Sequence, residues 1–210
     1  MRVQEANRPI TLAPPMLVLT LLVLVSALPA GAQTMNSLTA EEQKEGWTLL
    51  FDGKTPNGWA PRGDAKWEAQ NGELVAVQGE ARGHLATAGA YGDFRLRLEF
   101  WVDKAANSGV FIRAPETGAI NQGNSFEVNI SDSSANWPTG SINEIHKNPT
   151  ANTIGKWNTY DITAQGDHLV VVLNGEKTVD ARASRLPRGP IGLQYGGGTV
   201  KFRNIRILAK

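Results

Sequence analysis

The stretch FRLRLEFWV, residues 94–102, alternates apolar and polar side chains along its whole length. Its apolar members are Phe94, Leu96, Leu98, Phe100 and Val102, and between them stand Arg95, Arg97, Glu99 and Trp101. A period of two residues is that of a β-strand with one face in a core and the other in a polar environment. The stretch therefore predicts a long, half-buried strand.

Similar short runs follow one another on both sides of this strand. They are TLLF (48–51), WEAQNGELVAV (67–77), SGVFIR (108–113), FEVNIS (126–131), HLVVVLNGEKTV (168–179), IGLQY (191–195) and VKFRNIRIL (200–208). Asn-Gly pairs at 71–72 and 174–175 stand between apolar runs and predict tight hairpins. Val200 and Phe202 differ in parity from Ile205 and Ile207, so we expect a bulge near Asn204.

Outside the N-terminal apolar run, the spacing of apolar residues fits a helix over one short segment only. LTAEEQK (38–44) could form one turn with Thr39 as its cap and Glu42 three residues later. The composition, with 22 Gly and 11 Pro in 210 residues, is that of a turn-rich protein. Many short strands without interleaved helices predict an all-β fold, an antiparallel sandwich or jelly roll.

The N-terminal segment has the layout of a secretory signal peptide. The thirteen residues 16–28, MLVLTLLVLVSAL, are apolar and uncharged, and basic residues precede them. Ala30-Gly31-Ala32 supplies a cleavage motif. We therefore expect a signal peptide over 1–32, a linker over 33–45, one domain over 46–210, and export to the periplasm or the extracellular space. The alternative is an uncleaved anchor, although a membrane span needs about 20 residues.

Charge and cysteine content exclude several classes of function. Loss of residues 1–32 removes Arg2, Glu5 and Arg8 and takes the formal net charge from +1 to 0. A neutral chain gives no electrostatic reason to expect nucleic acid or an anionic membrane as a partner. The sequence contains no Cys, which excludes disulfides, thiolate catalysis and Cys-ligated zinc.

FEVNISD (126–132) places Glu127, Asn129 and Ser131 on one face of a predicted strand. Together with the polar face of 94–102, which includes Glu99, this face could line a trough of carboxylates, amides and indoles that suits sugar hydroxyls and rings. Carbohydrate is therefore the expected partner. The alternative is that both polar faces are simply solvated. A retaining glucanase would need two carboxylates about 5–5.5 Å apart, and Asn129 stands where the second is required.

Single residues add weaker indications. Arg113 ends the strand 108–113, and its guanidinium could bind an oxyanion or two hydroxyls. His146 lies in a long polar loop and is a candidate acid or base, although a loop histidine without such a role is the more common case. The three His residues, His84, His146 and His168, are too scattered to define a metal site by spacing.

The motifs together resemble the 3-keto-disaccharide hydrolase family. The matching segments are GWTLLFDGKTPNGW, WEAQNGEL, YGDFRLRLEFWV, NSGVFIR, FEVNISD, GKWNTYDI, LNG, IGLQY and VKFRNIRI, which run in order from Gly46 to Leu208. The resemblance implies a concanavalin A-like jelly-roll β-sandwich with a carbohydrate cleft. In some members it implies cleavage of glycosides already oxidised to a ketone at C3, by proton removal at C2 and elimination.

The resemblance also implies roles for particular residues. Glu127 would be the catalytic base or a metal-associated carboxylate, Arg113 a clamp for the enolate or a hydroxyl, and His146 a candidate acid for the leaving group. The implied sugar-binding residues are Asn107, Asn129, Gln194, Asp132 and Glu99. No cofactor is certain, and a divalent metal is possible.

Two positions depart from the family pattern. Asn129 replaces a longer Gln, and Asn143 stands where the resemblance implies an aromatic residue. Both changes alter the implied pocket and bear on which sugar it accepts. The sequence therefore predicts a glycoside hydrolase or lyase acting on 3-keto-disaccharides, with a non-catalytic, lectin-like carbohydrate-binding module as the alternative.

Overall fold

The computed structural model describes residues 34–210. The predicted signal peptide lies outside these residues. No helix within residues 34–210 is long and apolar enough to cross a membrane.

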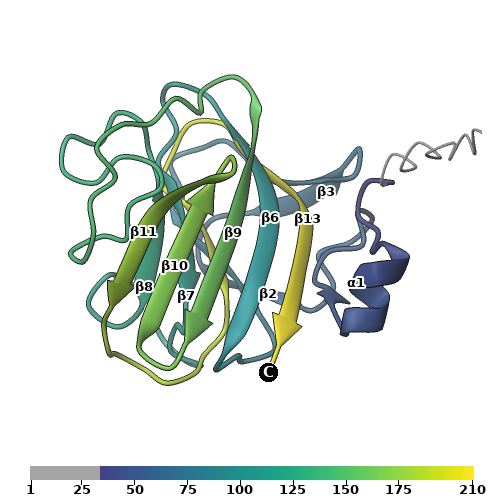
Figure 1. Ribbon diagram of the computed structural model, residues 1–210. Coiled ribbons are helices and arrows are strands. Elements are labelled where there is room, and N and C mark those ends of the chain that lie inside the picture. Colours follow the sequence, from purple (N-terminus) through teal and green to yellow (C-terminus); the bar gives the residue numbers. More distant parts are fainter. Residues whose placement is uncertain (1–33) are drawn as a thin grey trace, which may run out of the picture. The chain divides into compact units, whose positions relative to one another are not determined.

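The described chain is built almost entirely of antiparallel strands (Figure 1). Its elements are α1 (Ala40–Glu45), β1 (Thr48–Leu49), β2 (Trp59–Gly63), β3 (Trp67–Gln70), β4 (Glu73–Ala76), β5 (Gly83–Thr87), β6 (Phe94–Val102), β7 (Ser108–Ile112), β8 (Phe126–Ile130), β9 (Trp157–Gln165), β10 (His168–Leu173), β11 (Glu176–Arg182), β12 (Gly192–Tyr195) and β13 (Val200–Ala209). An eight-stranded sheet has the order β11-β10-β9-β6-β13-β4-β3, with β1 paired to β13. A five-stranded sheet has the order β2-β5-β12-β7-β8.

The two sheets pack face to face, which confirms the predicted sandwich. Strand β6 spans the expected residues and pairs with β9 on one side and β13 on the other. Its apolar residues are buried, and Phe100 packs against Tyr160 of β9 with ring centroids 4.8 Å apart. From the five-stranded sheet, Val110 and Val128 enter the same hydrophobic core. The alternation seen in the sequence is therefore the core-facing pattern of both layers.

The predicted turns and bulge are confirmed. Asn71-Gly72 joins β3 to β4 and Asn174-Gly175 joins β10 to β11, with positive φ at all four residues, as two-residue hairpin turns with primed geometry require. In β13 the register with β6 shifts between Arg203 and Arg206, and Asn204 has φ 52°. Local turn chemistry therefore fixed these three features.

Strands β2, β5 and β9 were not predicted from periodicity. In β2 the chain carries Pro61, which cannot donate to a sheet and therefore argues against a central strand. The structure resolves this conflict by placing β2 at the edge of the five-stranded sheet, where it pairs only with β5.

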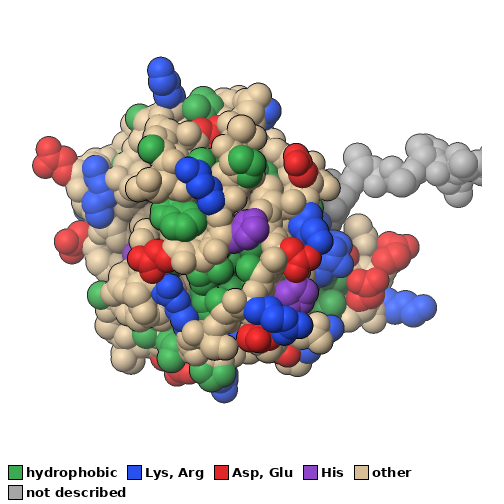
Figure 2. Space-filling model, turned by 60° about the vertical axis from the view of Figure 1, so that its left-hand side comes forward, with side chains coloured by type: hydrophobic (Ala, Val, Ile, Leu, Met, Phe, Trp, Pro, Cys, Tyr) green, Lys and Arg blue, Asp and Glu red, His purple; other side chains and the backbone are tan. Residues whose placement is uncertain are grey.

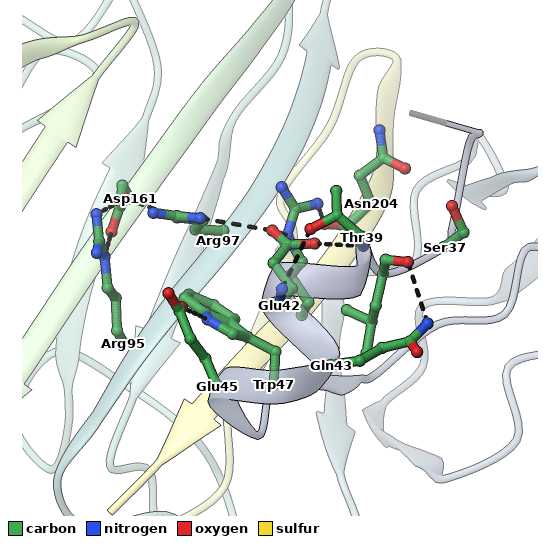
Figure 3. Close-up of polar contacts among 12 residues, drawn as sticks. Ser37, Thr39, Glu42, Gln43, Glu45, Trp47, Arg95, Arg97, Asp161 and Asn204 are labelled. Carbon is green, nitrogen blue, oxygen red and sulfur yellow. Dashed lines mark hydrogen bonds and ion pairs between the residues drawn. The ribbon is translucent and has the colours of Figure 1, made fainter. Parts of the chain in front are cut away.

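Helix α1 lies within the segment expected as a linker, and side-chain contacts bind it to the eight-stranded sheet (Figures 1 and 3). Thr39 and Glu42 form the predicted capping box. The Glu42 carboxylate also reaches Arg97 at 3.5 Å and Arg206 at 2.7 Å. The Arg97 guanidinium lies over the ring of Trp47, 4.7 Å from its centroid. One buried carboxylate thus joins the helix to two strands.

The ion pairs continue along the outer face of this sheet. Asp161 accepts hydrogen bonds from Arg95 and Arg97 (Figure 3). Burial raises the pKa of Asp161, but the two guanidinium groups outweigh this effect and hold its pKa below the usual value. Elsewhere, acidic and basic side chains are interspersed over the face drawn in Figure 2, in keeping with a net charge near zero.

We expect Glu42→Gln to destabilise the fold by roughly 1–3 kcal/mol, the contribution of hydrogen bonds to charged groups. Gln can still complete the capping box, so the change removes mainly the charge that Arg97 and Arg206 contact. Urea unfolding measures the loss, and Glu41→Gln on the exposed side of the same helix is the matched control. Equal stability of the two variants would contradict this account.

Candidate functional site

The outer face of the five-stranded sheet carries the side chains that could form a site. Because Phe126, Val128 and Ile130 enter the core, Glu127 and Asn129 must point to the opposite face. Along the neighbouring strands, Gly109 pairs with Asn129, and Gln194 pairs with His84. His84 in turn pairs with Arg62 of the edge strand.

Adjoining hollows cover this face. Two of them, of about 400 and 370 Å³, share Gln122, Glu127 and Gln194, and we call them together the β8 hollow. A larger hollow of about 820 Å³ lies over β5 and β12, and we call it the β5 hollow. The β5 hollow is lined by Pro61, Arg62, Gly63, Arg82, Gly83, His84, Asn107, Gly118, Ala119, Ile120, Gln194, Tyr195 and Gly196. Asn107 and Gln194 line both hollows, which are therefore continuous.

Among residues 34–210, Glu127 is the only carboxylate that lines the β8 hollow. It is 3% exposed, and its Oε2 accepts hydrogen bonds of 2.7 Å from the side-chain amides of Gln122 and Asn143. Within residues 34–210 it has no ion-pair partner, and its Oε1 accepts no hydrogen bond. One carboxylate oxygen is thus fixed while the other is available to a ligand.

Glu127 is buried and has no described cation beside it, and this environment changes the pKa of its carboxyl group. Desolvation raises the pKa of Glu127 above its usual value, and the hydrogen bonds from Gln122 and Asn143 offset this only in part. A carboxylate with a raised pKa inside a hollow binds a proton more readily than a solvated one. This is the property that a general base or acid needs near neutral pH.

A glycine on the adjacent strand makes room for this carboxylate. A Cβ atom at Gly109 would lie 2.7 Å from Glu127 Oε1 and 2.9 Å from its Cγ. These distances are shorter than any packed contact, so a side chain at position 109 would displace Glu127. The Gly in SGVFIR therefore has a spatial role that strand periodicity does not reveal.

Three buried polar atoms along the same face have no hydrogen-bond partner within the described residues. They are His84 Nε2, Asn143 Oδ1 and Gln194 Oε1. Buried polar groups in native proteins are almost always paired, so unpaired ones need an explanation. All three residues line the β5 hollow or the β8 hollow. This shared location favours a polar ligand as the missing partner.

The structure brings together several of the residues predicted from the sequence. Asn107, Asn129 and Gln194 line the β8 hollow with Glu127. The Asn129 amide already donates to the Trp137 carbonyl and holds the loop that forms one wall. Asn107 and Gln194 donate no side-chain hydrogen bond within residues 34–210, so both are available to a ligand.

Arg113 does not join them, so the expectation that it shares this hollow is wrong. Its guanidinium donates to the Gly92 and Gly166 carbonyls at 3.0 and 2.6 Å and to Asp93 at 3.2 Å. Arg113 itself has φ 51°, a left-handed conformation that turns the chain at the end of β7. Each of its three guanidinium nitrogens therefore donates to a surrounding turn.

The other predicted residues also lie apart from Glu127. Asp132 accepts hydrogen bonds from Thr139 and Thr153 and closes a loop. His146 lines a separate hollow of about 570 Å³ beside β10 and β11. Neither side chain lines the β8 hollow.

Glu99 lies on the other sheet, where it accepts hydrogen bonds from Arg203 and Asn204. The predicted common trough of strands 94–102 and 126–131 is therefore wrong. The two strands belong to different layers, and their polar faces point away from each other.

Sequence reasoning missed Gln122 and Asn143 as partners of Glu127, and His84 as a lining residue. Gln122 lies in a loop, and its position over Glu127 has no periodic signal. Asn143 was noted only as a departure from a family pattern. In the structure its amide donates to Glu127, so the substitution supplies a hydrogen-bond donor to the carboxylate.

The possible divalent metal has no evident cluster of ligands. Residues 34–210 contain no group of three or more His, Cys, Asp or Glu side chains placed to hold a metal ion. In the 400 Å³ part of the β8 hollow the side chains beside Glu127 are carboxamides, hydroxyls and one indole, and the other part adds Phe111 and Ile120.

The comparisons with known proteins agree with this architecture. A family model described as the 3-keto-alpha-glucoside-1,2-lyase-like domain matches residues 46–208. The chain belongs to this family. The resemblance inferred from the sequence motifs is thereby confirmed.

Three similar proteins share between 16% and 25% of their residues with this chain. A 3-keto-disaccharide hydrolase of Bacteroides thetaiotaomicron is 25% identical, over 84% of this chain and 82% of that protein. A Parabacteroides distasonis crystal structure, provisionally named as a glycosyl hydrolase, has a TM-score of 0.73 and 23% identity over 84% of this chain and 99% of that one. The carbohydrate binding module CBM66 of Bacillus subtilis has a TM-score of 0.59 and 16% identity, covering 71% and 94%. These structural likenesses establish the shared fold.

We expect Gln122→Leu to raise the pKa of Glu127 further, because the variant removes one of two donors that stabilise the carboxylate. Carbon-13 NMR of the labelled side-chain carboxyl follows its titration directly. Asn136→Leu, which lines the same hollow without contacting Glu127, is the control. An unchanged or lower pKa in Gln122→Leu would contradict the geometry.

Proposed function

We propose that this protein cleaves 3-keto-glycosides, with Glu127 as the base that removes the proton at C2. The observation that carries the proposal is the state of Glu127: a buried carboxylate in a hollow, held by two amides and unpaired with any described cation. The family and its 3-keto-disaccharide hydrolase relative support this choice of substrate.

The chemistry needs one proton acceptor and no second carboxylate. A ketone at C3 acidifies the C2 hydrogen, which passes to Glu127 Oε1 while the electron pair of the C–H bond forms the enolate. The enolate then reforms the C3 ketone, a double bond forms between C1 and C2, and the bond from C1 to the leaving oxygen breaks. The leaving oxygen takes up a proton, and water then adds across the double bond.

The environment of Glu127 suits both the removal and the return of a proton. Its raised pKa lies closer to neutrality, which improves the balance between accepting and releasing a proton. The amides of Gln122 and Asn143 fix Oε2 and leave Oε1 directed to the side where Gly109 has no side chain. The substrate can therefore approach the base closely.

Carboxamides replace the predicted arginine as the donors that stabilise the enolate. Because Arg113 is engaged elsewhere, the donors in the β8 hollow are amides and hydroxyls, and those of Asn107 and Gln194 also lie toward the β5 hollow. Preorganised donors that point at developing negative charge stabilise a transition state. We propose that these two amides contact the C3 oxygen and an adjacent hydroxyl of the sugar.

A second candidate function is non-catalytic carbohydrate binding. The β8 hollow contains one carboxylate and no histidine, so an acid for the leaving group is not evident in its lining. The fold is also that of a carbohydrate binding module. A retaining glucanase is disfavoured, because that mechanism needs a second carboxylate about 5–5.5 Å away.

A direct test offers the purified protein a disaccharide and its 3-keto derivative. We expect cleavage of the 3-keto sugar alone, with Glu127→Gln lowering kcat by roughly 100-fold or more, the usual contribution of a general base. Gln keeps the shape of the side chain and an acceptor for Gln122 and Asn143, so the fold should persist in circular dichroism and thermal unfolding. Binding of both sugars without turnover would favour the binding module.

The pH dependence of kcat/KM provides a further check on the same base. Glu127 must be ionised to accept a proton, so activity should fall as the pH drops through its raised pKa. That loss should set in at a higher pH than an ordinary solvated carboxyl would give. A fully active Glu127→Gln enzyme would remove this residue from the mechanism.

We expect Gly109→Ala to lower kcat by roughly 100-fold, because a misplaced reacting group costs about that much. The new methyl group would overlap Glu127 Oε1 and force the carboxylate to move. Steady-state kinetics on the 3-keto sugar measures the effect. Gly79→Ala, where an added Cβ meets nothing within 4 Å, is the matched control.

We also propose that the protein acts outside the cytoplasm. The support is the apolar run 16–28 followed by Ala30-Gly31-Ala32, which has the composition of a secretory signal. Cell fractionation followed by N-terminal sequencing of the mature protein would test both export and cleavage after Ala32.

A further inference from the structure

The β5 hollow is larger than either part of the β8 hollow and differs from it in charge. Its lining includes two arginines, Arg62 and Arg82, and no carboxylate. The β8 hollow has the opposite character, with Glu127 and no cation. The trough over the five-stranded sheet is therefore electrically asymmetric along its length.

Neither arginine is neutralised by a neighbour. Arg62 donates to the backbone carbonyl of Glu116, and Arg82 donates to the carbonyls of Gly79 and Ala81. Within residues 34–210 neither guanidinium forms an ion pair. By contrast, Arg95, Arg97, Arg203 and Arg206 on the other sheet all face carboxylates. Each guanidinium retains donors that a ligand could use.

Arg82 lines the β5 hollow at the end nearer to Asn107. Its guanidinium lies over the Tyr195 ring, 5.6 Å from the centroid, and a Cβ at Gly197 would be 3.4 Å from its Nη2. Gly197 is paired with Asn107, which lines both hollows. Arg82 therefore lies at the junction toward the β8 hollow, and Arg62 lies farther out on the edge strand.

His84 supplies a buried polar atom on the floor of the same hollow. It is 9% exposed, its ring meets Phe111 edge-on with centroids 4.6 Å apart, and its Nε2 has no partner within the described residues. Burial lowers the pKa of His84 to about 4, so the ring is neutral at physiological pH. Nε2 therefore keeps one unused hydrogen-bonding capacity, as donor or acceptor according to its tautomer, without adding charge.

The two hollows are continuous, but the strands beneath their far ends are farther apart than one sugar ring is long. Strands β8 and β5 are three positions apart in the sheet, which is roughly 14 Å at the usual spacing. Between them Ile120 packs over Gly192, where a Cβ would lie 3.2 Å from its Cδ1. Ile120 thus adds an apolar side chain to the lining of both hollows, at the end of β12 opposite to Arg82.

We propose that the β5 hollow binds an oxyanion, a carboxylate or a phosphate, carried by the leaving-group sugar of the substrate. Arg82 and Arg62 would bind the anion beyond the ring that Gln194 contacts. This inference rests on the proposed function, because it places the reacting ring at Glu127. It assigns a substrate class, 3-keto-disaccharides with an acidic leaving sugar, that neither the family nor its relatives specify.

The test compares 3-keto-α-glucosides of one linkage with three leaving sugars: glucuronate, glucose 6-phosphate and the neutral glucuronamide. We expect kcat/KM for at least one acidic substrate to exceed that for the amide by about tenfold or more, the ratio that one charge-assisted hydrogen bond provides. The two acidic substrates distinguish carboxylate from phosphate recognition. Equal values for all three would overturn the proposal.

The variant Arg62→Gln/Arg82→Gln should bring the ratio of acidic to neutral substrate close to one. Arg182→Gln, which removes an exposed guanidinium of β11 far from both hollows, is the matched control and should keep the preference. A preference that survives in the double variant would also overturn the proposal. High salt tests the same point without mutation. At about 1 M salt the Debye length is near 3 Å. The preference of the wild-type protein for the acidic substrate should therefore shrink.

Calorimetric binding of the corresponding non-oxidised disaccharides separates this inference from the proposed function. Those sugars lack the C3 ketone and are not expected to turn over, so the difference in affinity between the acidic and the neutral sugar reports the β5 hollow. Anion preference in binding without cleavage of any 3-keto substrate would support the anion site and contradict the chemistry. Cleavage with no preference in either measurement would support the chemistry and contradict the anion site.

Discussion

The alternation of side chains along β8 is the constraint on which the site depends. Phe126, Val128 and Ile130 are held in the core, so Glu127 cannot turn inward and must occupy the outer face. Loops then cover that face and leave the carboxylate 3% exposed. The same strand that closes the hydrophobic core thereby places a poorly solvated carboxylate beside a hollow, and the energy of the core sustains an otherwise unfavourable burial.

The two outer faces use their charges in opposite ways. On the eight-stranded sheet, arginines and carboxylates neutralise one another, and the resulting cluster binds α1 to the sandwich. On the five-stranded sheet, Glu127 and the arginines of the β5 hollow have no ionic partners within residues 34–210. Satisfied pairs contribute to stability, whereas unpaired charges and unpartnered polar atoms are available to a ligand. This contrast distinguishes the face whose ion pairs bind α1 from the face that carries the candidate site.

The amide-rich surroundings of Glu127 bear on how the family's chemistry could work in this chain. Carboxamides hold the carboxylate in place without adding positive charge, so the pKa of Glu127 stays raised. A cation in the position of Gln122 or Asn143 would lower that pKa and weaken the base. The predicted arginine clamp would have had this effect at close range. Its absence from the hollow is therefore consistent with a single carboxylate that both accepts and returns a proton.

The sequence by itself determined the β-sandwich class, both Asn-Gly hairpins, the bulge at Asn204 and the outward direction of Glu127. These features are local, because a two-residue period and the φ values of a turn depend on near neighbours in the chain. Only the tertiary structure decided that Glu99 and Glu127 lie on different layers, that Arg113 joins turns, and that Gln122 reaches the carboxylate. Those relations depend on sheet order and on the path of loops, which bring together residues that no period in the sequence connects.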